Sequence, residues 1–324
     1  MNTLPEKDLP PGRHRLLKEH LMTEIRQASQ VPRRDETPAR VRSKWLRPAI
    51  AAVAVAAVAA TVVVAMPASD GKSGPGAAPG ASKQVSKDVS KDVPKDAATL
   101  LGDIALAAEH QKVPGNIRDD QFVYIESRVG YSVYENNKPA RVEPIHEREI
   151  WLSVDGDHWG LLKEDNHIGT TKLEPDPLHT PSDTDYRNLQ TLPTDPDKML
   201  DWLHKNGNGG TSENQQAFAL VGDLVSESLL PPDVGAALFR AAAKIPGVVV
   251  VPDAVDAAGR HGVAVARVDG GEREELIFDR ETKKYLGERV VAVEDLPSGF
   301  KKGQTTGSSA ILKREVVDKA GQRP

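Results

Sequence analysis

The chain has 324 residues and no cysteine, which excludes disulfides, thiolate metal sites and cysteine nucleophiles. Residues 1–47 carry eleven basic and six acidic side chains, a net charge of +5, whereas the remainder carries 31 basic and 41 acidic ones, about −10. A basic segment joined to an acidic body is typical of a protein with a membrane or nucleic-acid partner.

Residues 1–47 are predicted to form a basic arm with one amphipathic helix over about residues 13–28. Leu17, Leu21 and Ile25 recur every four residues and so share one face of that helix. Residues 31–44 contain two prolines and many charges, so no second helix within the arm covers this apolar stripe. The stripe is a candidate binding face for a partner protein or for the anionic inner leaflet. The alternative is a marginal helix with no dedicated partner.

The next segment is predicted to cross a lipid bilayer. Residues 49–66 contain no charge, and at ~1.5 Å rise per residue they span roughly 27 Å, close to the ~30 Å hydrocarbon core. Trp45 and Arg47 precede them, where an interfacial aromatic side chain and a cytoplasmic cation belong. We therefore expect a transmembrane helix over residues 48–66, a cytoplasmic amino terminus and an extracytoplasmic carboxyl-terminal domain.

This apolar run has two other interpretations. A cleaved signal peptide has a shorter apolar core that begins close to the first methionine, whereas this run follows about forty-eight residues of polar chain. A buried helix of a soluble protein is compatible with the many alanines. It does not explain the cluster of arginine and lysine on one flank and the linker on the other.

Residues 67–96 are predicted to be a flexible tether. Their composition changes to Pro, Gly, Ala, Ser, Lys and Asp, and the run SKDV occurs at residues 86–89 and again at 90–93. With one valine in four residues, such a segment cannot bury enough apolar area to offset its conformational entropy. The tether thus separates the membrane span from everything that follows.

Residues 97–324 are predicted to be one extracytoplasmic domain that begins with a helix over residues 97–111. A half-buried strand follows at residues 121–129, with Tyr124, Glu126 and Arg128 on its outer face. Residues 145–154 and 157–163 flank the pair Asp155-Gly156, which predicts a hairpin with a two-residue type I′ turn. In that register Ile150 and Leu152 face Leu161 and Trp159, and residues 164–189 are expected to be loop.

The remaining segments alternate between the two periodicities. Helices are predicted over residues 195–204, 212–228 and 233–244, and strands over residues 248–251, 262–268, 274–278, 285–293 and 310–317. Runs of strands joined by turns, with helices between them, indicate an α+β fold. We expect a curved antiparallel sheet covered by helices.

No catalytic, cofactor or metal site is predicted, and the chain is expected not to be an enzyme. The nine histidines lack metal-binding spacing, and there is no glycine-rich phosphate loop and no Gly-x-Ser-x-Gly elbow. Asp253, Asp256 and Arg260 look like a catalytic group, but their spacing after an apolar strand favours a turn. Residues 146–149, His-Glu-Arg-Glu, are interpreted as a charged strand face in cross-strand pairs.

Three stretches resemble an uncharacterised family of actinobacterial single-pass membrane proteins: DLPPGRHRLLKEHLM at residues 8–22, IPGV at 245–248 and DAAGRHGVAV at 256–265. The layout is similar to that of transmembrane anti-sigma factors, although the zinc-binding His/Cys motif of many anti-sigma domains is missing. The resemblance implies a sigma factor of the extracytoplasmic-function type as partner. It also implies an ectodomain similar to the curved-sheet carriers and sensors of the periplasm.

Two hypotheses follow. In the preferred one, the arm holds a cytoplasmic regulatory protein such as a sigma factor while the outer domain senses an envelope condition. In the other, the arm is only an anchor and the outer domain carries a lipid or cell-wall component as an apolar ligand in the concave face of its sheet. No direct nucleic-acid contact is expected in either, and an exported enzyme is the least favoured reading.

Overall fold

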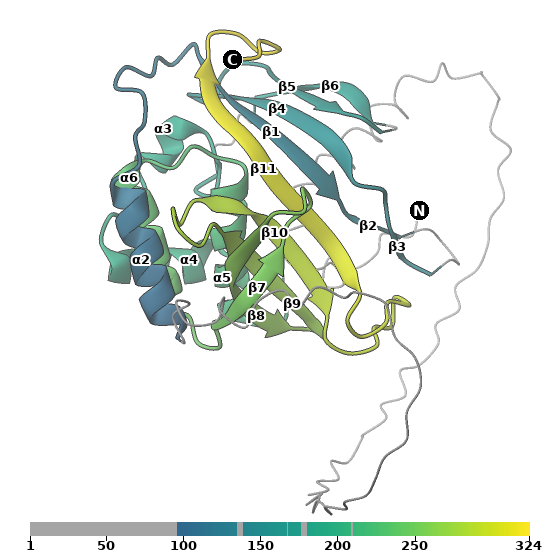
Figure 1. Ribbon diagram of the computed structural model, residues 1–324. Helices are drawn as coiled ribbons and strands as arrows, with labels where there is room; N and C mark the ends of the chain where they lie inside the picture. Colours follow the sequence, from purple (N-terminus) through teal and green to yellow (C-terminus); the bar gives the residue numbers. More distant parts are fainter. Residues whose placement is uncertain (1–95, 135–138, 167, 176–179, 209) are drawn as a thin grey trace, which may run out of the picture. The chain divides into compact units, whose positions relative to one another are not determined.

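The computed structural model describes residues 96–134, 139–166, 168–175, 180–208 and 210–324 (Figure 1). Within these ranges, no helix has both the length and the apolar character that crossing a bilayer requires. The predicted arm, membrane span and all but the last residue of the predicted tether lie outside the described residues. So do the side chains assigned to partner binding and to the membrane interface, Leu17, Leu21, Ile25, Trp45 and Arg47.

The four helices predicted between residues 97 and 244 are confirmed within two residues at each end. Asp96 accepts the backbone N–H of Thr99 at 2.8 Å, and this cap begins α2 (Ala97–Glu109). Asp195 and Ser212 cap the next two long helices in the same way. These are α4 (Pro196–Asn206) and α5 (Glu213–Ser226), and they are followed by α6 (Pro232–Ala242), which begins at a proline.

The strands form one antiparallel sheet in the order β6-β5-β4-β1-β11-β10-β9-β8-β7 (Figure 1). Its members are β1 (Phe122–Gly130), β4 (His146–Ser153), β5 (Gly160–Glu164), β6 (Gly169–Leu173), β7 (Val249–Val255), β8 (His261–Asp269), β9 (Glu272–Phe278), β10 (Tyr285–Ala292) and β11 (Thr305–Val317). A two-stranded ribbon, β2 (Ser132–Val133) and β3 (Arg141–Val142), forms a separate sheet that contacts β11. The large antiparallel sheet with helices confirms the α+β class. The 13-residue β11 lies between β1 and β10 and so joins early strands to late ones.

The long helices cover one face of the sheet. Their apolar stripes pack against side chains from β8 and β9, among them Val265, Leu276 and Phe278, all fully buried. Ile125 on β1 and Ile150 on β4 also point to the helix-covered side, where they join a second buried cluster. We call the opposite side of the sheet the open face.

The β4–β5 hairpin forms, but the predicted two-residue turn is wrong. Ile150 lies opposite Leu162 and not opposite Leu161, so the register differs by one residue from the prediction. Because strand side chains alternate, this single step moves Leu161 to the open face, where it packs beside Trp151. Trp159, which was expected to share the apolar face, is 52% exposed.

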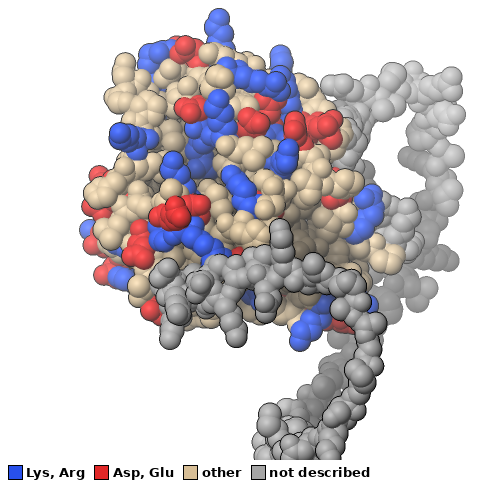
Figure 2. Space-filling view, viewed as in Figure 1, with Lys and Arg blue, Asp and Glu red and all other residues tan. Residues whose placement is uncertain are grey.

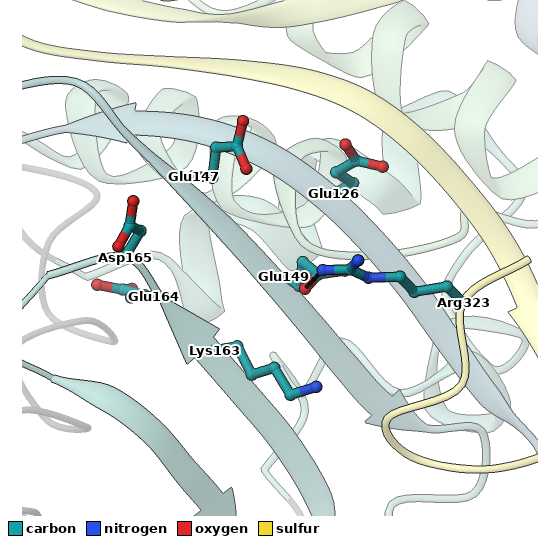
Figure 3. Close-up of a pocket in the computed structure, with 7 residues that line it drawn as sticks. All are labelled: Glu126, Glu147, Glu149, Lys163, Glu164, Asp165 and Arg323. Carbon is teal, nitrogen blue, oxygen red and sulfur yellow. Dashed lines mark hydrogen bonds and ion pairs between the residues drawn. The ribbon is translucent and has the colours of Figure 1, made fainter.

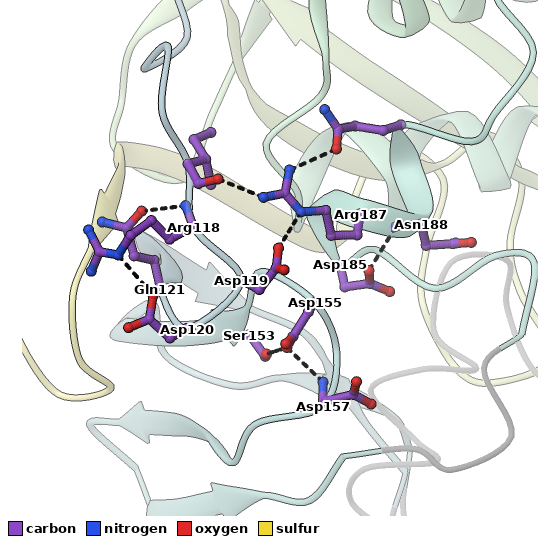
Figure 4. Close-up of polar contacts among 12 residues, drawn as sticks. Arg118, Asp119, Asp120, Gln121, Ser153, Asp155, Asp157, Asp185, Arg187 and Asn188 are labelled. Carbon is purple, nitrogen blue, oxygen red and sulfur yellow. Dashed lines mark hydrogen bonds and ion pairs between the residues drawn. The ribbon is translucent and has the colours of Figure 1, made fainter.

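A wider loop replaces the tight turn because its residues bond elsewhere (Figure 4). The backbone of Val154 donates to the carbonyl of Gln121 and accepts from Arg187, so it is not available to β5. The side chain of Asp155 accepts hydrogen bonds from the Ser153 hydroxyl at 2.6 Å and from the backbone N–H of Asp157 at 2.9 Å. These bonds stabilise a turn of its own, which sequence spacing does not reveal.

Two further expectations need correction. The segment predicted as loop, residues 164–189, contains the edge strand β6 and the one-turn helix α3 (Tyr186–Leu189). The outer face of β1 and the charged face of β4 are also less exposed than predicted, since Tyr124, Arg148 and Glu149 are 1%, 2% and 7% exposed. Both faces of these strands are therefore covered near their middle.

Candidate functional site

Alternation along β1, β4 and β5 places charged side chains in a row on the open face. Glu126 lies opposite Glu149, and Glu149 lies opposite Lys163 on the next strand. Figure 3 shows these three side chains on one side of the strands, with the helices behind the sheet. Two carboxylates directly opposite each other destabilise an antiparallel pair, so cations nearby must compensate.

The row forms part of a pocket of about 380 Å³. Seven residues line it: Glu126, Glu147, Glu149, Lys163, Glu164, Asp165 and Arg323. The carboxylate of Glu164 pairs with Arg148 on the other side of the sheet, so four carboxylates and two cations belong to the open face. Lys163 reaches toward the ring of Trp151, with its ammonium 5.0 Å from the ring centre. The pocket therefore has an excess of negative charge. On the face that Figure 2 shows, the two signs are intermixed.

Arg323 contributes the cation that compensates Glu149. Its Nε and one terminal nitrogen each donate to a different carboxylate oxygen of Glu149, both at 2.6 Å. These two bonds hold the pKa of Glu149 below its usual range, although burial acts in the opposite direction. The Tyr124 hydroxyl donates to the same carboxylate at 2.7 Å, and burial together with Glu149 raises the pKa of that phenol. Glu149 is thus an ionised carboxylate fixed in one orientation.

Arg323 belongs to a carboxyl-terminal segment, residues 318–324, that crosses the open face and that we call the strap. At its start, Asp318 accepts hydrogen bonds from Arg118 and Gln121, each at 2.9 Å. Near its end, the indole Nε1 of Trp151 donates to the backbone carbonyl of Gln322 at 2.5 Å. The strap passes beside an aromatic cluster formed by Phe122, Tyr124 and Trp151.

A second charged group lies on the helix-covered side, under α5. The guanidinium of Arg148 contacts Glu164 at 3.0 Å and Glu227 at 2.8 Å, and Glu227 caps the carboxyl end of α5. His146 lies 3.4 Å from the other oxygen of Glu164. Neighbouring residues of β4 therefore form ion pairs on opposite sides of the sheet. The cross-strand pairing predicted for residues 146–149 is confirmed for three of them. The pairs of His146 and Arg148 with Glu164 are buried, whereas that of Glu147 with Arg128 is exposed.

A buried carboxyl group also lies beneath α5. Glu274 on β9 is 5% exposed, and the Gln215 amide donates to it at 2.6 Å. Burial, together with the charges of Glu288 and Asp223, raises the pKa of Glu274 well above its usual range. This carboxyl therefore holds its proton to a higher pH than an exposed one.

The grouping of Asp253, Asp256 and Arg260 forms a turn, as predicted. Asp256 accepts the backbone N–H of Ala258 and of Arg260 at 2.9 Å and the Arg260 guanidinium at 2.7 Å. Asp253 pairs with Arg280 at 2.6 Å. The Asp256 contacts form the turn between β7 and β8, and the Asp253 contact joins β7 to the turn after β9.

In the part of the chain that the structure describes, no three histidine, aspartate or glutamate side chains are placed to hold a metal ion. The acidic side chains around Asp119 and Asp155 hold loops in place through hydrogen bonds and ion pairs. Arg187 on α3 donates to Asp119 and to the carbonyl of Ile117, both at 2.6 Å, and so fixes the loop before β1 (Figure 4).

Sequence reasoning did not find the pocket. Glu126 and Glu149 were visible as charges on predicted strands, but nothing local marks Arg323 as their partner. That residue is 174 positions from Glu149. The only signal in the sequence was the alternation of side chains along each strand, since residues two apart share a face.

Comparison with known proteins places the chain in no family. No family model matches it, and no curated protein does. A solved structure entitled "Crystal structure of MucB" aligns with a TM-score of 0.26 and 14% sequence identity, over 70% of this chain and 60% of that chain. The chain thus spans less than two thirds of that protein's length, and no fold or function is inferred from so low a similarity.

Proposed function

We propose that this protein is a single-pass, membrane-anchored regulator that is not an enzyme. Its outer domain binds a ligand, and its cytoplasmic arm holds a regulatory protein such as an extracytoplasmic-function sigma factor. The uncharged run at residues 49–66 between a basic arm and an acidic body supports the membrane topology. The resemblance of residues 8–22 to an actinobacterial family with an anti-sigma layout supports the choice of partner.

The observation that carries the outer half of the proposal is the charged pocket on the open face. It is built from three neighbouring strands, and its central carboxylate, Glu149, is 7% exposed and fixed by two partners. A preformed pocket with fixed polar groups is what a binding site requires. Its charged lining favours a polar, cationic ligand over the apolar ligand of the carrier hypothesis.

The inner half of the proposal depends on the apolar stripe Leu17, Leu21 and Ile25. Buried against a partner helix or groove, a stripe of this spacing supplies most of the binding energy, and the surrounding arginines speed association. Substitution of the middle residue by aspartate places a charge in that interface. Because an unpaired buried charge costs several kcal/mol, binding should fall by at least about a hundredfold.

The test is capture of the sigma factor by the tagged full-length protein in membranes, comparing Leu21→Asp with Glu19→Ala. Glu19 lies on the opposite side of the predicted helix, so its replacement should leave capture unchanged. Equal capture by both variants would show that the stripe is not the interface. A reporter fused to the carboxyl end tests the topology separately, because an intracellular signal contradicts the proposed orientation.

A further inference from the structure

The strap places a cation from the chain's own end in the pocket, and that cation is exchangeable. The side chain of Arg323 is 70% exposed, whereas that of Glu149 is 10% exposed. The carboxylate is therefore a fixed part of the sheet, while most of the guanidinium remains in water. Exposed ion pairs contribute little net free energy, so a competing cation in solution can replace Arg323 without a large penalty.

The contacts of the strap also define what the competing molecule must look like. Glu149 takes the guanidinium in the two-pronged geometry that distinguishes arginine from lysine. The indole N–H of Trp151, a fully buried side chain, donates to the main-chain carbonyl of the residue immediately before that arginine. One fixed donor and one fixed acceptor thus recognise a peptide carbonyl and the next residue's guanidinium. A metal ion or a simple amine satisfies only the carboxylate.

The remaining lining attracts the same kind of molecule. Glu126 and Glu147 add negative charge beside Glu149, and Lys163 is directed toward the Trp151 ring. With Arg323 displaced, the open-face lining keeps four carboxylates and one cation. Such a field speeds the approach of basic segments and disfavours acidic ones.

We propose that this pocket binds an arginine-containing segment of a partner protein, with the carbonyl on Trp151 and the guanidinium on Glu149. The strap is then an autoinhibitory contact that fills the same two positions in the free protein. The inference rests on the proposed function, since it names the class of ligand that the outer domain receives.

The test measures the affinity of the full-length protein for a fluorescently labelled peptide probe, Gly-Gly-Ala-Arg-Gly-Gly. Arg323→Ala removes the internal competitor, so its affinity for the probe should rise about fivefold, the upper range for an exposed ion pair. Lys319→Ala removes a charge of the same sign from the same segment, and Lys319 does not line the pocket, so affinity should stay within about twofold of wild type. Glu149→Gln should lose at least about tenfold, because the charged acceptor is gone.

A probe in which citrulline replaces arginine keeps the shape and loses the charge, and it should not bind to the unaltered protein. Equal affinity of Arg323→Ala and wild type would overturn the autoinhibitory role of the strap. Undiminished binding by Glu149→Gln, or by the citrulline probe, would overturn the site. These outcomes are independent of sigma-factor capture: a probe that binds while capture fails contradicts the proposed function, and the reverse contradicts this inference.

Discussion

Replacement of Glu274 by glutamine should stabilise the protein, and increasingly so as the pH rises. The carboxyl is buried under α5, close to Glu288 and Asp223, so its pKa is raised and its charged form is disfavoured in the folded state. A raised pKa contributes stability that is fully present below the unfolded value, about 4.3, and that is lost as the pH rises through the folded value. Glutamine stays neutral throughout and can accept the same bond from Gln215.

The magnitude follows from linkage. Each pH unit between the unfolded and the folded pKa costs the wild type about 1.4 kcal/mol, so the advantage of Glu274→Gln grows with pH until the folded pKa is passed. Below about pH 4 the two proteins should be equally stable. The exposed Glu281, in the turn after β9, is a matched control whose replacement by glutamine should change stability by less than about 0.5 kcal/mol.

The assay is urea denaturation of the full-length protein at several pH values between 4 and 8, followed by near-ultraviolet circular dichroism. The difference between Glu274→Gln and wild type should grow with pH, and that of Glu281→Gln should not. A difference that is constant with pH, or a variant that is less stable at pH 7, would refute the reasoning. Either result would mean that the charged form of Glu274 is accommodated in the folded state.

Three other substitutions test the packing of the domain. Gly287→Ala should lower the free energy of unfolding by roughly 2 kcal/mol or more, since a Cβ there would lie 2.2 Å from the Ser309 carbonyl oxygen. Gly102→Ala in α2, where a Cβ meets nothing within 4 Å, should instead raise it by about 0.5–1 kcal/mol, and thermal unfolding measures both. Arg148→Met should cost roughly 3–5 kcal/mol in urea denaturation because it leaves the buried Glu164 and Glu227 without their cation, and adding Glu227→Gln should recover part of the loss.

The elements that sequence reasoning located correctly are those defined by local chemistry. α5 combines a serine cap at Ser212 with an apolar face, and both signals lie within one helix. The turn at residues 269–271 contains two glycines with positive φ, which few other residues adopt. The strands around it were predicted for the same reason, because their ends are marked by residues that the turn itself needs.

Errors arose where a distant residue decides the local structure. Asp155-Gly156 is a good two-residue turn in isolation, but the backbone of Val154 bonds to Gln121 and Arg187 instead. β6 consists of Gly169 and polar residues with one leucine, and it is a strand because β5 offers it a free edge. Propensity within five residues does not contain that information.

The candidate site depends on a still longer connection, and this explains why the charge pattern alone misled. Residues 146–149 look like one solvated, charged face, yet β4 alternates, so Arg148 points under α5 and Glu149 points to the open face. Each then needs its own partner, and the partners come from Glu227 and Arg323, about 80 and 174 positions further along the chain. Removing Glu227 takes from the buried Arg148 one of its two carboxylate partners, at a cost that exceeds the value of the pair itself. A strand with four consecutive polar residues is therefore stable here because the fold brings partner charges to both of its faces. Of the two ion pairs, only the one on the open face has an exposed partner, Arg323, that a cation from solution can replace.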